Sequence, residues 1–299
     1  MHIIEKIVPL HESHPVRAWH GVLLLILLVF AFSLNAWAKN TKGLVRIHVL
    51  DVGQGDAIFI TMPGDHQVLI DGGPPGSAVP HVSALMPSWD RTLDLVVASH
   101  PHSDHIGGLI DVLEQYEVTH ILKGFESYDS ATAREWERLV QAEGAVVTEG
   151  VAGVRYDFGA SISLSVVFPI NSRSGVPSKD ANEDSLVFLF QYEHVRMLFT
   201  GDAEQGTESA LVLAEEDIRA DILKAGHHGS ITSTTPTFLA TVRPQAVLIS
   251  VGQGNRYGHP HPVTIDRLAG AGIPYYRTDQ RGNVTVTSDG RSFSITTER

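Results

Sequence analysis

Residues 100–105 read His100-Pro101-His102-Ser103-Asp104-His105, which places four side chains able to bind a metal within six positions. An apolar run, Leu95–Ser99, precedes them, and a run with helical spacing follows. His100 and His102 point the same way in an extended chain, whereas Asp104 and His105 fall where the helix begins and point elsewhere. The spacing therefore predicts two adjacent metal ions, one bound by His100 and His102 and the other by Asp104 and His105.

The composition leaves imidazole and carboxylate groups as the available metal ligands. The 299-residue chain has 16 histidines and no cysteine, which excludes disulfides, thiolate-bound zinc, iron–sulfur clusters and a cysteine nucleophile. Histidine and carboxylate together select zinc or another first-row ion. The formal net charge of −12 argues against broad electrostatic binding to nucleic acid or anionic lipid, although bound metal ions would create a local cationic site.

The first 38 residues form a separate segment. Val22–Phe32 is an unbroken apolar run, and Ala36-Trp37-Ala38 after it is a small-x-small cleavage pattern. This order is typical of a secretory signal peptide. Residues 18–38 are also long enough for an uncleaved membrane anchor. Both interpretations place the rest of the chain outside the cytoplasm, either periplasmic or secreted, or anchored to the outer face of the cytoplasmic membrane.

From Gly43 onward, short β-like runs alternate with helical runs, and no low-complexity linker divides them. We therefore expect one domain over residues 43–299, in which sheets are sandwiched by helices. Strands are expected at Val45–Asp51, Ala57–Thr61, Val68–Asp71, Leu95–Ser99, Ser161–Phe168, Ser185–Tyr192, Val195–Thr200, Ile222–Leu223 and Ala246–Ser250, with a closing hairpin of Gly282–Thr287 and Ser292–Thr297, and helices at Ile106–Tyr116, Arg134–Ala142, Glu204–Ala214 and Val263–Ala269.

A weak internal repeat supports this arrangement. LIDGG at 69–73 precedes ASHPHSDH at 98–105, and LFTGD at 198–202 precedes LKAGHHGS at 223–230. Each half thus has a strand that ends in glycine and aspartate, followed by a strand that ends in histidines. Two such halves packed face to face would bring both histidine clusters to one edge of the sandwich.

The segments around these clusters resemble a known family. HxHxDH at 100–105 is a motif of the metallo-β-lactamase superfamily, and the chain resembles in particular the C-terminal hydrolase domain of the ComEC DNA-internalisation competence proteins. This resemblance spans about residues 48–282 and implies a four-layer αββα sandwich with two metal ions at one edge. It also implies a hydrolytic reaction. In such relatives the bond hydrolysed is a phosphodiester, in DNA or in phosphorylated cell-wall or choline-type groups. The segments that carry it are HVLDVGQGDAIFI, LIDGG, ASHPHSDHIGGL, NEDSLVF, MLFTGD, LKAGHHGS, SVGQGNRYGHPHP and YYRTDQRG.

The same resemblance assigns roles to single residues. Asp202 is the expected bridging carboxylate, and Asp71 is expected to support the site from beneath. One of His227 and His228 completes the second metal. Neighbouring residues on an extended segment face opposite ways, so we expect one ligand and one group facing the substrate. The resemblance favours His228 as the ligand and leaves His227 as the general acid, while Asp104 counts both as a ligand and as a catalytic residue. The expected nucleophile is a hydroxide held between the two ions.

Two departures from the family pattern bear on the metal. Many relatives have a third histidine on the first metal, and here only His120 and His194 lie between the two clusters. His194 stands at the wrong end of an apparent strand, and His120 is better explained as a residue that opens a strand. Oxygen donors from Asn182–Ser185, or water, would then complete the coordination of the first metal and admit manganese. His102 replaces an aspartate of many relatives, and this nitrogen ligand favours zinc. We expect two divalent ions, zinc first and manganese as the alternative.

Several further polar residues are candidates for binding the substrate. His259 and His261 lie in a proline-rich stretch that could complete the pocket, contact phosphate, bind a metal or form a rigid surface loop. Lys224, Arg256 and Arg277 are candidate phosphate contacts. The glycine-rich DVGQGDA at 51–57 lacks the lysine of a P-loop, so it is not interpreted as a nucleotide site.

These observations predict a metal-dependent phosphodiesterase or nuclease. The alternatives are a hydrolase of another ester, thioester or lactam, and a catalytically silent, metal-bound binding protein of the cell envelope. The expected partners are a phosphodiester substrate, with DNA as one option, and the membrane or a DNA-uptake channel. The sequence leaves the oligomeric state open.

Overall fold

The computed structural model describes residues 19–30, 43–124, 128–172, 180–214 and 216–299. The chain divides into two units, Met1–Gly43 and Leu44–Arg299. In the first, residues 19–30 are helical. Within the described ranges, no helix is both long and apolar enough to cross a membrane. The cleavage pattern at 36–38 lies outside the described residues, so export by a signal peptide or an anchor stays a prediction.

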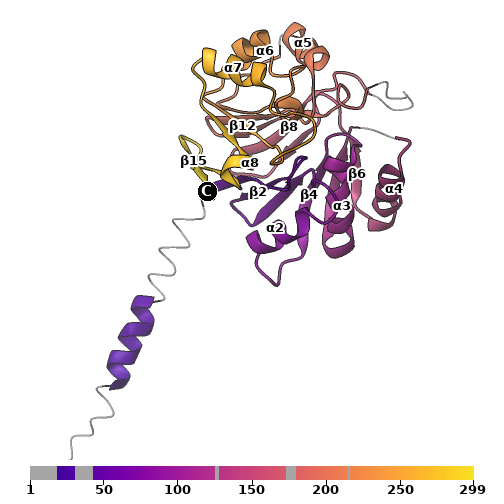
Figure 1. Ribbon diagram of the computed structural model, residues 1–299. Coiled ribbons are helices and arrows are strands. Elements are labelled where there is room, and N and C mark those ends of the chain that lie inside the picture. Colours follow the sequence, from indigo (N-terminus) through magenta and orange to yellow (C-terminus); the bar gives the residue numbers. More distant parts are fainter. Residues whose placement is uncertain (1–18, 31–42, 125–127, 173–179, 215) are drawn as a thin grey trace, which may run out of the picture. The chain divides into compact units, whose positions relative to one another are not determined.

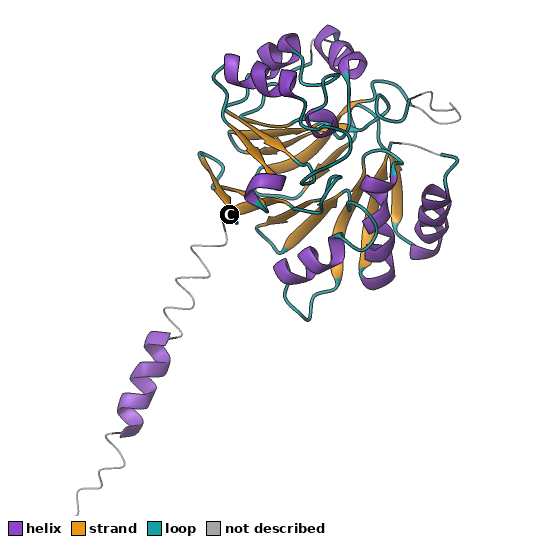
Figure 2. Ribbon diagram, viewed as in Figure 1, coloured by secondary structure: helices purple, strands orange, loops and turns teal. Residues whose placement is uncertain are grey.

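The second unit has the predicted four-layer αββα architecture (Figures 1 and 2). Two mixed β-sheets face each other, and helices cover the outer face of each. One sheet has the strand order β15-β14-β1-β2-β3-β4-β5-β6 and the other has the order β13-β12-β11-β10-β9-β8-β7. The strands are β1 Val45–Val49, β2 Ile58–Met62, β3 His66–Ile70, β4 Thr92–Ala98, β5 Glu117–Lys123, β6 Val146–Glu149, β7 Arg155–Asp157, β8 Ile162–Phe168, β9 Val187–Tyr192, β10 Val195–Phe199, β11 Ile222–Lys224, β12 Ala246–Ile249, β13 Tyr275–Arg277, β14 Val284–Ser288 and β15 Phe293–Thr297.

Three apolar clusters hold the layers together. Alternate residues of the two sheets, such as Ile60 and Phe188, fill the central cluster between them. A second cluster joins one sheet to helices α2, α3 and α4 and includes the fully buried Trp136 of α4. A third joins the other sheet to α5, α6 and α7 through residues such as Phe238. The helices are α2 Ala78–Leu85, α3 Ser103–Gln115, α4 Ala131–Glu143, α5 Gln205–Leu213, α6 Pro236–Val242, α7 Pro262–Gly270 and the short α8 Thr278–Arg281.

The two halves of the unit repeat the same topology. In the first half, β1, β2 and β3 pair antiparallel, and β3, β4, β5 and β6 pair parallel. In the second, β8, β9 and β10 pair antiparallel, and β10, β11, β12 and β13 pair parallel. The LIDGG and LFTGD segments therefore occupy equivalent strand ends. The carboxyl-terminal hairpin β14–β15 then extends the first sheet beside β1.

The expected elements all form, with ends that differ by a few residues. Short or mixed segments were missed: α2, α6, α8, and the strands β6, β7 and β13. His120 lies inside β5 rather than at its start, so that assignment is wrong. A strand of three or four residues shows too little alternation to be recognised, and pairing with a neighbouring strand decides whether it forms.

His48 on β1 should make the stability of this unit depend on pH. Its Nδ1 lies 2.9 Å from Thr285 Oγ1 on β14, and burial, helped by Arg46, lowers the pKa of His48 from 6.5 to about 4. The unfolded chain therefore takes up a proton there near pH 6.5, and the folded chain only near pH 4. The stabilising contribution is complete above pH 6.5 and is lost as the pH falls toward 4.

The variant His48→Asn keeps a polar group beside Thr285 but cannot titrate in this range. We expect the difference in unfolding free energy between parent and variant to change by about 3 kcal/mol between pH 7 and pH 4, in the direction that weakens the parent at low pH. Urea unfolding at several pH values measures it. A difference that is constant over this range would contradict the shifted pKa.

Candidate metal centre

Both histidine clusters lie at the same edge of the sandwich, as the internal repeat predicted. Residues 100–105 follow β4, and residues 227–228 follow β11. Asp71 follows β3 and Asp202 follows β10, each the parallel neighbour of the strand that carries a cluster. Carboxyl ends of parallel neighbours meet at one edge of a sheet, so each half supplies one aspartate and one cluster.

The first cluster is shaped by the start of α3. His102 is the N-cap residue, and its carbonyl accepts hydrogen bonds from the backbone N–H groups of His105 and Ile106. This turn brings His102 Nδ1 to 3.1 Å from His100 Nε2, so these two side chains converge as expected. The sequence analysis expected His105 to point away from His100. The centroids of the two rings lie only 4.1 Å apart, so this expectation is wrong for His105.

Glycine allows this turn to lie against the loop after β3. The backbone N–H of Gly72 donates to the carbonyl of His105 at 2.7 Å. A Cβ on Gly108 would stand 2.0 Å from the carbonyl oxygen of Gly72, so no side chain fits there. The Ile-Gly-Gly sequence after the motif therefore has a packing reason.

Asp202 lies between the two clusters. Its carboxylate is 3.3 Å from His105 Nε2, 3.4 Å from His228 Nε2 and 3.8 Å from His100 Nε2. Its backbone N–H donates to Ser185 Oγ at 3.1 Å, which anchors the loop after β10. Ser185, one of the oxygen donors expected for the first metal, thus orients Asp202, and the role of residues 182–185 as metal ligands stays a prediction.

Asp71 lies beneath the centre, where the resemblance placed it. One oxygen accepts from His105 Nδ1 at 2.8 Å, and the carboxylate also accepts from the backbone N–H and the hydroxyl of Ser99. The hydrogen bond at Nδ1 directs Nε2 of His105 toward Asp202. Such an outer carboxylate both orients a ligand and raises its basicity.

The prediction that residues 227–228 are extended is wrong. Both have left-handed backbone angles, with φ of 45° and 53°, inside the 3₁₀ turn Gly226–Gly229. The two side chains nevertheless diverge. His228 is 1% exposed, and its Nδ1 donates to the carbonyl of Ser250 at 3.0 Å, which turns Nε2 toward Asp202. His227 is partly exposed and its Nδ1 contacts Glu204 Oε1 at 2.7 Å.

Lys224 is not a phosphate contact. It is completely buried, forms an ion pair with Asp56, and donates to the carbonyl of Gly201 at 3.0 Å. Asp56 itself was missed by the sequence analysis. It is 1% exposed and lies 3.4 Å from His228 Nδ1 and 4.0 Å from His105 Nδ1, so it stands behind the imidazoles of both clusters.

The loop that carries Asp56 is tied to the opposite half of the unit. Ser250 Oγ donates to the carbonyl of Gly55 at 2.7 Å, and the backbone N–H of Gly252 donates to the side chain of Gln54. The glycine-rich segment 51–57 therefore positions a buried carboxylate under the centre and links the two halves.

The residues present fit a divalent cation. Nε2 of His105, Nε2 of His228 and Oδ1 of Asp202 are buried and have no hydrogen-bond partner among the residues that the structure describes, although they lie close to one another. An unpaired buried polar atom costs about 1–3 kcal/mol, so three of them in one place need a common partner. His100, His105 and Asp202 offer atoms within 4.8 Å of one another, and so do Asp104, His105 and His228. His100 and His102 would hold one ion, Asp104, His105 and His228 the other, with Asp202 between.

The charges of the centre are strongly coupled. Burial disfavours a charge on His105 and His228, but the carboxylate of Asp202 outweighs it and raises the pKa of both. Burial and the nearby His105 instead lower the pKa of His100. A proton and a cation compete for the same imidazole nitrogens, so the affinity for metal should decrease as the pH is lowered. The surrounding imidazoles keep Asp202 ionised by lowering its pKa against the effect of burial.

The other predicted residues have separate places. His259 packs its ring 5.2 Å from that of His227, so it belongs to the rim of the centre. His261 caps α7, since its Nδ1 accepts from the backbone N–H of Val263. Arg277 is held in a two-bond pair by Asp279.

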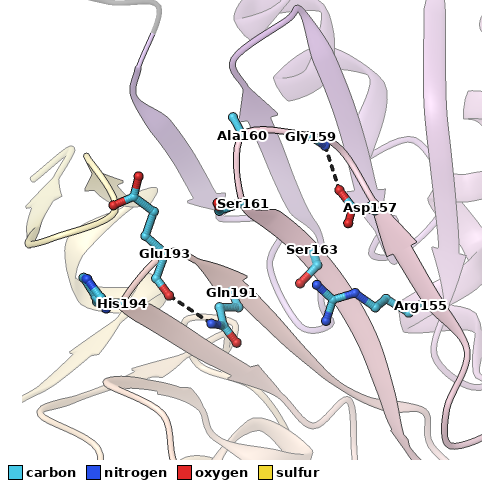
Figure 3. A pocket seen from close by; sticks show the side chains of 9 residues that line it. All are labelled: Arg155, Asp157, Gly159, Ala160, Ser161, Ser163, Gln191, Glu193 and His194. Carbon is cyan, nitrogen blue, oxygen red and sulfur yellow. Dashed lines mark hydrogen bonds between the residues drawn. The ribbon is translucent and has the colours of Figure 1, made fainter.

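His194 lies away from the centre, as expected from its position before β10. It lines an open hollow of about 730 Å³ beside the β9–β10 turn, with Arg155, Gln191 and Glu193 (Figure 3). Asp202 follows the opposite end of β10. Neither His194 nor His120 supplies a third histidine to the first metal.

A carboxylate between two histidine clusters at the edge of an αββα sandwich defines a metal-dependent hydrolase. The chain belongs to the metallo-β-lactamase superfamily, whose model matches residues 50–253. The ComE operon protein 3 of Bacillus subtilis is 30% identical over 84% of this chain and 34% of its own length. Recombination protein 2 of Haemophilus influenzae is 28% identical over 84% of this chain and 29% of its own length.

The chain thus spans about a third of the length of these curated relatives. Among solved structures, a variant of the β-hydroxylase CmlA has a TM-score of 0.54 and 15% identity, over 81% of this chain and 53% of that one. This likeness concerns the fold alone, and one fold carries several reactions. The substrate has to be argued from the side chains of the site.

Proposed function

We propose that this protein is a metal-dependent phosphodiester hydrolase of the cell envelope, with nucleic acid as the substrate class. The observation that carries the proposal is the position of Asp202 within 4 Å of imidazole nitrogens from both clusters, with unpartnered atoms directed into the space between them. This arrangement suits two ions that clamp one group.

Two divalent ions bound there would neutralise developing negative charge and supply a nucleophile at neutral pH. The residues of the chain do the rest. Asp71 and the Ser250 carbonyl fix the rotation of His105 and His228. Asp56 and Lys224 compensate each other's charge beneath them.

The rim of the centre favours an anionic substrate. His227 is the partly exposed imidazole next to Asp202, at 3.9 Å, and the Asn182 side-chain amide lies 3.4 Å from its ring. Both can donate to phosphoryl oxygens. Glu204, on Nδ1 of His227, leaves Nε2 to exchange a proton with the leaving oxygen. The names of the relatives, which refer to competence and recombination, support a nucleic-acid substrate.

A hydrolase of another ester, thioester or lactam is the class to be excluded. Purified full-length protein should be analysed for metal and assayed with zinc or manganese on bis-p-nitrophenyl phosphate, an acyl thioester and nitrocefin. We expect about two equivalents of metal and turnover of the phosphodiester alone. Turnover of the thioester or of nitrocefin without phosphodiester hydrolysis would overturn the proposal, and metal binding without any turnover would indicate a binding protein.

We further propose that the protein acts outside the cytoplasm and associates with the membrane or with a DNA-uptake channel. A fusion of residues 1–45 to a reporter enzyme active only outside the cytoplasm should show activity, because we propose that the apolar run Val22–Phe32 acts as a transport signal. A fusion of residues 33–45 is the control without that run. An amino terminus at Lys39 would indicate cleavage, and a reporter that is silent in both fusions would contradict export.

A further inference from the structure

A line of rings leads from the metal centre to the surface. Ring centroids of His228 and His227 are 6.0 Å apart, those of His227 and His259 are 5.2 Å apart, and those of His259 and Tyr257 are 6.0 Å apart. The first ring is buried beside Asp202, and the last is 53% exposed. His259 and Tyr257 are nearly parallel, with 15° between their planes.

Asn255 holds the outer part of this line in place. Its Nδ2 donates to the carbonyls of Gly252 and His259, and its Oδ1 accepts from the backbone N–H groups of Tyr257 and His259. One side chain thus satisfies four backbone groups of a loop that lacks regular structure. Gly252 is itself tied to Gln54 in the first half of the unit. The loop is therefore built to present Tyr257 in a defined position.

A cation accompanies the exposed ring. The guanidinium of Arg256 lies 5.0 Å from the centroid of the Tyr257 ring and donates to its hydroxyl at 2.9 Å. Arg256 is exposed, and within the described residues no carboxylate lies within ion-pair distance of it. Its charge is thus available to a ligand.

We propose that Tyr257 and Arg256 form a subsite for an unpaired nucleotide of a single-stranded nucleic acid whose scissile phosphate lies at the metal centre. This inference rests on the proposed function and deepens it. Proteins hold unpaired bases by stacking them on exposed aromatic rings along the path of the nucleic acid, and arginine pairs with the phosphates beside these rings. In a duplex the bases stack on one another, so their faces are closed to Tyr257 without unstacking.

The overall charge makes this subsite decisive. At a formal net charge of −12 the protein repels a polyanion, so an extended strand needs specific contacts to stay bound. A small phosphodiester occupies the centre alone and does not require Tyr257. Binding of a strand and hydrolysis of a small diester should therefore respond differently to substitution.

The test measures fluorescence anisotropy of a labelled 12-nucleotide phosphorothioate strand with the full-length protein, so that binding is read without turnover. We expect Tyr257→Ala to weaken binding about 5- to 100-fold, the loss that follows removal of one base–ring stack, and Tyr257→Phe to keep it. Trp89→Ala is the matched control. Trp89 is 85% exposed but lies before the amino end of β4, whereas the histidine cluster follows the carboxyl end of that strand. Hydrolysis of bis-p-nitrophenyl phosphate should be unchanged in Trp89→Ala.

Arg256→Ala should lower the slope of log affinity against log salt by about 0.7, the value for one phosphate contact of a single strand. Strand binding by Tyr257→Ala that equals the parent, or an equal loss in Trp89→Ala, would overturn the subsite. An equal effect of Tyr257→Ala on a duplex would do so as well. Strand binding that needs Tyr257 in a protein that hydrolyses no phosphodiester would instead overturn the proposed function and keep the subsite.

Discussion

Replacing Asp202 by asparagine is expected to remove both metal equivalents together and to lower hydrolytic turnover by about 10³-fold, because bound ions stabilise the transition state by several kcal/mol. The reason is that its carboxylate stands within 4 Å of His100 and His105 of one cluster and of His228 of the other. An amide of the same shape keeps the packing but cannot carry the charge that two cations share. A ligand on one ion alone would cost one equivalent.

Metal analysis after dialysis, together with turnover of bis-p-nitrophenyl phosphate, measures this. Asp266→Asn is a matched control, because Asp266 is an exposed aspartate on α7. Circular dichroism separates loss of metal from loss of fold. A variant that keeps two equivalents and full turnover would refute the bridging role of Asp202.

The two histidines of the Gly226–Gly229 turn should differ in kind. His228→Ala is expected to cost metal, because its buried Nε2 lies 3.4 Å from Asp202 and 3.6 Å from Asp104. His227→Ala is expected to keep the metal and to slow turnover about 10²- to 10⁴-fold, the contribution of a positioned proton donor. Its ring is partly exposed and faces the rim, so its removal leaves no buried hole.

Metal content and turnover measured on both variants check this difference, with thermal unfolding in a chelator to control for folding. Equal metal loss in both would remove the assignment of His227 as the acid. Full metal content and full turnover in His227→Ala would move the proton to water or to His259, since His261 caps α7.

Local sequence was sufficient for the architecture. HxHxDH, the repeated pattern of a strand followed by aspartate and then by histidines, and the resemblance that rests on them led to the αββα sandwich. These features are local because a strand end, a turn glycine and a helix start each need only a few neighbouring residues. The short strands β6, β7 and β13 were missed, since a strand of this length forms only where a partner lies beside it.

The residues of the centre could be predicted from the sequence, but the contacts between their side chains could not. Histidines and aspartates in two clusters were sufficient to predict a site with His100, His102, Asp104, His105, Asp202 and one of His227 and His228. The left-handed turn at 227–228, the ion pair of Lys224 with Asp56, and the contact of Glu204 with His227 depend on segments that are distant in sequence. Lys224 reads as a surface charge because its partner lies 168 positions earlier, in the glycine-rich loop of the other half. Residue type and spacing determine which groups can bind a metal, whereas tertiary packing decides which atoms meet, because burial and charge compensation arise only when segments that are distant in sequence come together.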